Sequence, residues 1–132
     1  MSKCLDSLSY QILNCAYRVH SNLGNGLLER VYRTCLAHEL RKSGLNVREE
    51  VPVPLVYDGI QFDQGFRLDL VVEEQFVLEL KVTDGIAPNH VAQVLSYLRF
   101  TQMKHGFILN FMEKSLKNGI KRIILDPNYR RD

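Results

Sequence analysis

The sequence of 132 residues lacks any long hydrophobic run, and no stretch approaches the roughly 18 uninterrupted apolar residues of a membrane span. The first residues also lack an apolar signal core before their first charges, so we expect a cytoplasmic protein with no membrane segment. The three cysteines cannot all pair with one another, and none forms a C-x-x-C motif. They are therefore expected to be thiols that pack as small buried hydrophobic residues.

Several common catalytic and cofactor-binding patterns are missing as well. The chain has no P-loop, no G-x-G-x-x-G motif and no H-x-x-x-H spacing, and none of its cysteines has a paired histidine. These absences argue against a phosphate-cradling glycine loop, a zinc site and a Cys/His or Ser/His/Asp nucleophile.

Neither sign of charge is in large excess, because the formal net charge is only +2. Residues 113–132 carry six Lys/Arg against three Asp/Glu, and the rest of the chain carries eleven against twelve. The basic end is either a solvated segment or a weak electrostatic footprint for nucleic-acid phosphates. The charge pattern alone leaves both readings open.

The composition that remains is that of a folded domain, with 45% apolar and 24% charged residues. The length suits one domain, which we assign to residues 1–132. Apolar residues at helical spacing predict helices over 8–23, ended by Gly24-Asn25-Gly26, and over 28–40, ended by Gly44. A third helix is expected to begin at Pro88.

Between the helices the period changes to that of strands. Alternation predicts a strand over 47–53, and Pro52 and Pro54 mark it as an edge strand. Asp58-Gly59 predicts a tight hairpin turn, and Asp63-Gln64-Gly65 suggests a bulge. Further strands are expected over 66–72, 76–82, 106–111 and 120–125. The order ααβββαββ predicts a mixed α/β (α+β) fold with a central mixed sheet flanked by helices.

The expected hairpin of 66–72 and 76–82 contains the most informative residues. One face is entirely apolar and should lie in the core: Phe66, Leu68, Leu70, Val72, Phe76, Leu78, Leu80 and Val82. The other face carries Arg67, Asp69, Val71, Val77, Glu79 and Lys81. With a turn at Glu73-Glu74-Gln75, Asp69 should lie opposite Glu79 and Arg67 opposite Lys81.

Two carboxylates facing each other at about 5 Å repel by on the order of 3 kcal/mol at an effective dielectric near 20. A divalent cation would remove this conflict, because carboxylate oxygens are the ligands that Mg²⁺ or Mn²⁺ prefers. Lys81, on the same face, could hold a water or a phosphate oxygen beside the metal. The alternative is a solvated face on which Arg67 and Lys81 simply neutralise Asp69 and Glu79.

Two helices add polar residues beside their apolar stripes. On the third helix, His90, Gln93 and Tyr97 lie at helical spacing beside that stripe. On the second helix, Glu29 and Tyr32 follow Gly26 at the edge of the apolar face. Each of these residues alone is typical of an ordinary helix surface or core.

Together, Asp69, Glu79-Leu80-Lys81 and Gln93-x-x-x-Tyr97 resemble the PD-(D/E)XK nuclease superfamily, and the last motif resembles its RecB-like branch. The run from Gly26 to Tyr32 and the tail Gly119-Ile120-Lys121-Arg122 are similar to the GxxExxY family of that superfamily. One departure is Leu68, which stands where the superfamily motif has proline before Asp69. The resemblance spans roughly residues 8–125 and implies a restriction-endonuclease-like core.

The resemblance also implies residue roles. Asp69, Glu79 and the carbonyl of Leu80 would bind Mg²⁺ or Mn²⁺, and Glu29 would complete the site directly or through water. Lys81 would orient the attacking water or stabilise the charged phosphorus centre. Gln93 and Tyr97 would contact a water on the metal or the substrate backbone.

Two functions follow from this reading. The first is a metal-dependent nuclease that hydrolyses phosphodiester bonds, with DNA expected as substrate rather than RNA. The second is a non-catalytic nucleic-acid-binding or protein-assembly module that keeps the nuclease fold and acts as a homodimer or with a protein partner. The intact motif residues favour the first, and the modest net charge favours the second.

Overall fold

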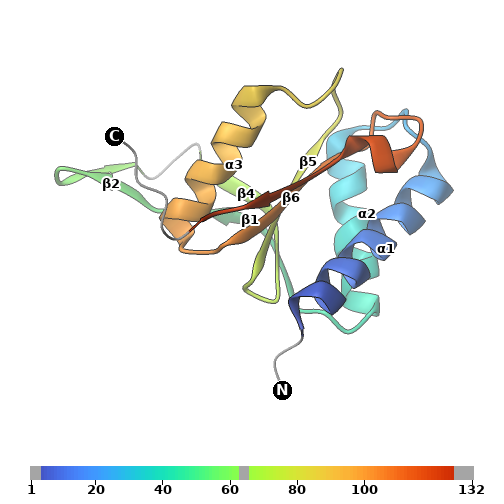
Figure 1. The fold of residues 1–132 in the computed structure, drawn as a ribbon, viewed down its shortest axis with the longest axis horizontal. Coiled ribbons are helices and arrows are strands. Elements are labelled where there is room, and N and C mark those ends of the chain that lie inside the picture. Colours follow the sequence, from blue (N-terminus) through green and yellow to red (C-terminus); the bar gives the residue numbers. More distant parts are fainter. Residues whose placement is uncertain (1–3, 63–65, 127–132) are drawn as a thin grey trace.

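The computed structural model describes residues 4–62 and 66–126 (Figure 1). The elements in chain order are α1 (Leu5–Leu23), α2 (Glu29–Lys42), β1 (Val47–Pro52), β2 (Leu55–Tyr57), β3 (Ile60–Phe62), β4 (Arg67–Val72), β5 (Phe76–Lys81), α3 (Pro88–Thr101), β6 (His105–Asn110), the 3₁₀ helix η1 (Leu116–Gly119) and β7 (Ile120–Ile124). This is the expected order with two short strands, β2 and β3, and the short helix η1 added. The suggested bulge at residues 63–65 lies outside the described residues.

Five strands form one mixed sheet in the order β1-β4-β5-β6-β7. Neighbouring strands are antiparallel except for β5 and β6, which are parallel and are joined through α3. β1 lies at an edge of the sheet, as its prolines predict, and the β4–β5 hairpin lies inside it. The predicted fold, a mixed sheet flanked by helices on a restriction-endonuclease-like plan, is confirmed.

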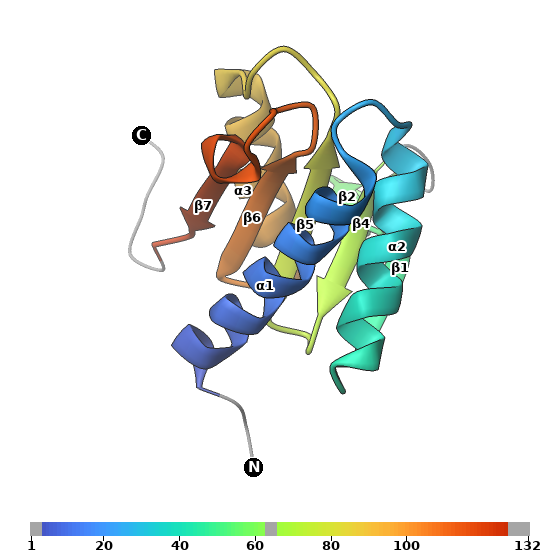
Figure 2. The ribbon, with the colours of Figure 1, turned by 90° about the vertical axis from the view of Figure 1, so that its right-hand side faces the viewer.

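The helices lie on both faces of the sheet, which creates two apolar clusters (Figures 1 and 2). The larger cluster packs α1 and α2 against one face and includes Leu70, Leu78 and Leu80. The smaller cluster packs α3 against the other face and includes Val94 and Leu98. Burial on both faces explains why β5 is almost continuously apolar.

Three details of the predicted faces are wrong. Phe66, expected in the core, is 38% exposed and lies just before β4. Val71 and Val77, expected on the polar face, are buried in the smaller cluster beneath α3. Leu68 is buried as expected, but it belongs to the smaller cluster and not to the larger one with Leu70. The alternation of apolar residues identified one buried face, but it could not show that a helix also covers the other.

The cysteines are more varied than expected: Cys15 is buried, Cys35 is half-buried and Cys4 is exposed. Within the part of the chain that the structure describes, no helix is long and apolar enough to cross a bilayer.

Candidate active site

The backbone pairing of the central sheet is interrupted at Asp69. β4 and β5 pair in the predicted register from Val72 with Phe76 to Leu70 with Leu78, where the ladder ends. On the other side of β4, the ladder with β1 pairs Leu70 and Leu68 but leaves out Asp69. The expected pair of Arg67 with Lys81 does not form. The strands therefore separate at the point where the acidic residues lie.

The side chains of Asp69 and Glu79 fill this interruption. The backbone N–H of Asp69 donates to Oε1 of Glu79 at 3.3 Å, and the backbone N–H of Leu80 donates to Oδ2 of Asp69 at 2.8 Å. Each carboxylate thus accepts from the backbone of the opposite strand. The two acids do meet, but through these cross-strand contacts and not as a regular ladder pair.

The Glu79 carboxyl is strongly perturbed. Glu79 is only 5% exposed, and burial, followed by the nearby Asp69 carboxylate, raises its pKa from 4.5 to about 8. Burial also raises the pKa of Asp69, while its hydrogen bond from Leu80 and the charge of Lys81 lower it. Two buried carboxyl groups in contact cannot both ionise easily without an added positive charge.

Charged groups from α2 and β5 surround this pair. Burial and the charge of Asp69 raise the pKa of Glu29, the first residue of α2, while Lys81 and Arg33 lower it. Lys81 acts in the same direction on both Asp69 and Glu79. The structure therefore brings Glu29, Asp69, Glu79 and Lys81 within electrostatic reach of one another.

Helix α3 contributes Tyr97 but not Gln93. Tyr97 is buried, and its pKa is raised by burial and by the charges of Glu79 and Asp69. Gln93 is exposed, and no hydrogen bond joins it to Asp69 or Glu79 in the described part of the chain. His90 stabilises the start of α3, because its Nδ1 accepts a hydrogen bond from the backbone N–H of Ala87 at 3.0 Å.

Tyr32 holds the loop that leads to Glu29. Its hydroxyl donates to the carbonyl of Gly24 at 2.5 Å and accepts from the N–H of Leu27 at 3.1 Å. Its ring stacks on Phe111, with centroids 4.6 Å apart. The spacing from Gly26 through Glu29 to Tyr32 therefore has a physical meaning: the tyrosine anchors the loop and the glutamate begins the helix.

A sequence match shows the family of the protein. The model of the PD-(D/E)XK nuclease superfamily matches residues 6–123. The chain belongs to this superfamily. No curated protein matches the chain. PD-(D/E)XK nucleases act on nucleic acids and generally use divalent metals such as Mg²⁺, so membership suggests a nuclease.

The donor set of this PD-(D/E)XK chain fits a hard divalent cation. Within residues 4–62 and 66–126, no group of three His, Cys, Asp or Glu side chains could hold a metal ion. Mg²⁺ does not require such a cage, because one or two carboxylates, waters and substrate oxygens commonly complete its shell. Asp69 and Glu79 supply two carboxylates whose pKa values are raised first by burial, so a nearby positive charge would favour their ionised forms.

Two residues near this site were not identified from the sequence. Arg33 lies one turn after Glu29 on α2, contacts Glu50 at 3.4 Å and lowers the pKa of both Glu29 and Asp69. Its position four residues after Glu29, on the same face of the helix, was the sequence signal that could have identified it.

The second is Asn110, which is fully buried at the end of β6 and lies beside Lys81 in the parallel ladder. Its side chain donates to the carbonyl of Thr83 at 2.9 Å and accepts the N–H groups of Thr83 and Met112, both at 3.2 Å. It thereby fixes the backbone that follows Lys81. No sequence signal distinguished it from other strand residues.

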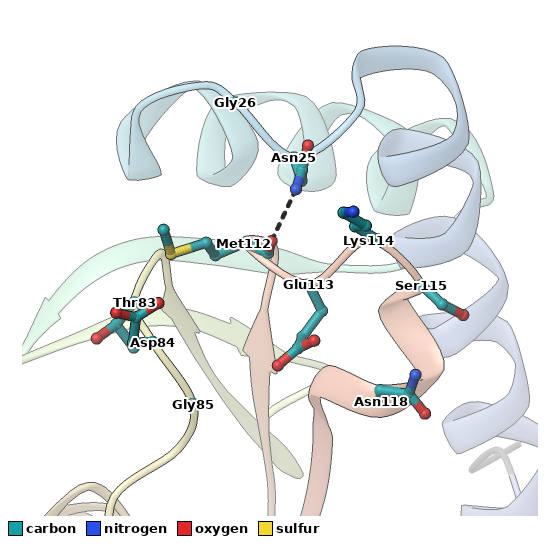
Figure 3. Close-up of a pocket in the computed structure, with 10 residues that line it drawn as sticks. All are labelled: Asn25, Gly26, Thr83, Asp84, Gly85, Met112, Glu113, Lys114, Ser115 and Asn118. Atoms are coloured by element: carbon teal, nitrogen blue, oxygen red, sulfur yellow. Dashed lines mark hydrogen bonds between the residues drawn. The ribbon is translucent and has the colours of Figure 1, made fainter.

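A pocket of about 760 Å³ opens beside the end of β5 (Figure 3). It is lined by Asn25, Gly26, Thr83, Asp84, Gly85, Met112, Glu113, Lys114, Ser115 and Asn118. Asn25 closes one side by donating from Nδ2 to the carbonyl of Met112 at 2.9 Å. Thr83 follows the strand that carries Lys81, and Gly26 precedes Glu29, so the pocket is lined by chain neighbours of two candidate site residues.

Proposed function

We propose that the whole chain, residues 1–132, is a single PD-(D/E)XK nuclease domain that hydrolyses phosphodiester bonds in DNA with Mg²⁺ or Mn²⁺. We place it in the GxxExxY family, with Gln93-x-x-x-Tyr97 as a RecB-like motif. The observation that carries the proposal is the meeting of Asp69 and Glu79, next to Lys81, where the sheet ladder is interrupted.

Asp69, Glu79 and the carbonyl of Leu80 are the proposed metal ligands, and Glu29 is proposed to bind the metal directly or through water. A bound divalent ion supplies charge neutralisation at the phosphate and lowers the pKa of water. The burial of Asp69 and Glu79 makes their ionised pair depend on such a charge.

Lys81 provides a fixed positive charge where negative charge develops on the phosphate. The three hydrogen bonds of the Asn110 side chain restrain the backbone after Lys81 and so fix the point from which the lysine side chain extends. Tyr97 supports the site from α3, where its hydroxyl can donate to a carboxylate or a phosphate oxygen. Gln93, which is exposed on the same helix, is proposed to contact the substrate backbone.

The test is hydrolysis of single- and double-stranded DNA by the purified chain with Mg²⁺ or Mn²⁺. Lys81→Ala should lower the rate by on the order of 10²–10³ while metal binding, read as a rise in the thermal midpoint, is retained. Lys42→Ala is the matched control, because Lys42 is an exposed lysine at the opposite end of α2 from Glu29. Absence of both cleavage and a metal-dependent midpoint shift in the wild type would leave a non-catalytic module with this fold.

A further inference from the structure

The strands β2 and β3 form a two-stranded sheet of their own, which projects from the body of the protein (Figure 1). The Asp58-Gly59 turn joins them as predicted, and both residues have positive φ angles. The strands pair over three positions, from Leu55 with Phe62 to Tyr57 with Ile60. A two-stranded hairpin of this size is only marginally stable in water without a further contact.

This hairpin presents large apolar side chains to solvent. Tyr57 is 71% exposed, Val56 60%, Ile60 55% and Phe62 44%. Residues 55–62 include no lysine or arginine, and their only charged side chain is Asp58. The surface is therefore aromatic and aliphatic, without the cations that bind a phosphate backbone.

The hairpin leaves the sheet at the same end as the candidate active site. At its base, the N–H of Val53 donates to the carbonyl of Phe66 at 2.8 Å, and Pro52 pairs with Arg67. Arg67 begins β4, which places it two residues before Asp69. A strand rises about 3.3 Å per residue, so the base of the hairpin lies within about 10 Å of that acid along the chain.

The size of the surface argues against a second copy of the chain as its occupant. Tyr57, Ile60 and Phe62 share one face of the hairpin, whereas Val56 lies on the other. From their exposed fractions, these three side chains offer on the order of 300 Å², given the 150–250 Å² of a large side chain. A stable protein interface needs about 800 Å² from each partner. A surface of this area suits one or two planar groups.

We propose that the β2–β3 hairpin is a stacking surface for unpaired bases of the nucleic acid that reaches the active site. Aromatic side chains stack on any unpaired base, whereas the bases of a duplex are already stacked within it. The inference rests on the proposed nuclease function and extends it: the substrate has single-stranded character beside the cleaved bond. Tyr57 and Phe62 are the residues assigned to stacking.

Binding of a fluorescent single-stranded DNA oligonucleotide, without divalent metal so that cleavage does not occur, tests the proposal. Tyr57→Ala and Phe62→Ala should each raise the Kd by about 5- to 150-fold, because stacking contributes about 1–3 kcal/mol per base. Tyr57→Phe should bind almost as the wild type does. Tyr10→Ala is the matched control, since Tyr10 is 69% exposed on α1. A blunt duplex of the same length should bind with no dependence on Tyr57 or Phe62.

Equal affinities of the wild type and both alanine variants would overturn the proposal. So would a wild-type dimer, seen by sedimentation, that Tyr57→Ala converts to monomer while the Kd for DNA is unchanged. The proposed function fails separately: if the wild type cleaves nothing but the hairpin variants lose single-strand binding, the stacking surface stands without a nuclease. If the wild type cleaves and the hairpin variants bind normally, the nuclease stands without the stacking surface.

Discussion

The substitution Glu79→Gln tests the electrostatic basis of the candidate site. Glu79 is buried against Asp69, and a glutamine keeps an oxygen that can accept the N–H of Asp69 while removing the ionisable group. Without metal, the wild type must either keep Glu79 protonated or hold two carboxylates in contact. The variant avoids both of these unfavourable states, because its amide carries no charge.

The magnitude follows from the pKa of Glu79. The carboxyl has a pKa of 4.5 when exposed in the unfolded chain and about 8 in the folded protein. Between these values the folded state binds more protons, so the free energy of unfolding falls as pH rises. Below pH 4.5 this loss is absent, and above about pH 8 it is complete. At about 1.36 kcal/mol per unit, the loss is on the order of 5 kcal/mol, and it is smaller where Asp69 shares the proton.

Urea unfolding at intervals between pH 5 and pH 8 measures this dependence, with EDTA in one series and Mg²⁺ in the other. In EDTA the wild type should lose stability across the range while Glu79→Gln changes much less. At a Mg²⁺ concentration of 100 times the Kd, the wild type should regain about 2.7 kcal/mol and the variant little. Glu74→Gln is the control, because Glu74 is an exposed carboxylate that pairs with Arg48. Parallel pH profiles for the wild type and Glu79→Gln would refute the reasoning.

Three further predictions concern the framework around the site. Leu80→Ala truncates a fully buried side chain of the larger cluster and should lower the free energy of unfolding by about 2–5 kcal/mol in chemical denaturation. Tyr32→Phe removes the hydroxyl between Gly24 and Leu27 and should cost about 1–2 kcal/mol, with faster proteolysis of the loop before Glu29 as a second readout. Gly119→Ala would place a Cβ 2.4 Å from the carbonyl oxygen of Asn110, so its thermal midpoint should fall, and an unchanged midpoint would show that the η1 turn adjusts freely.

Local signals in the sequence predicted most of the framework correctly. The glycines after the first two helices do end them, with Gly24 and Gly44 at positive φ angles. Pro88 begins α3, and the prolines near residue 52 mark an edge strand. These predictions succeeded because each depends on the conformational limits of one or two residues and not on distant contacts.

The features that sequence reasoning missed arise from tertiary contacts. Counting residue pairs along β4 and β5 correctly predicted that Asp69 lies near Glu79, but the count assumed a continuous ladder. In the structure the ladder ends before this pair, and the carboxylates accept the N–H groups of Asp69 and Leu80 in place of backbone carbonyls. The burial of Val77 depends on a crossover helix that packs from elsewhere in the chain. The separation of β2 and β3 from the main sheet likewise has no signature in the alternation of residues 55–62.

The interruption in the central sheet also gives the protein an internal reporter. The amide hydrogens of Asp69 and Leu80 are held by carboxylate oxygens, not by peptide carbonyls. Their exchange with solvent deuterium is therefore governed by the ionisation and ligation of those two side chains, while amides in the regular ladder at Leu70 and Leu78 exchange only when the sheet opens. Comparing the two pairs of amides separates an event at the acidic residues from unfolding of the domain.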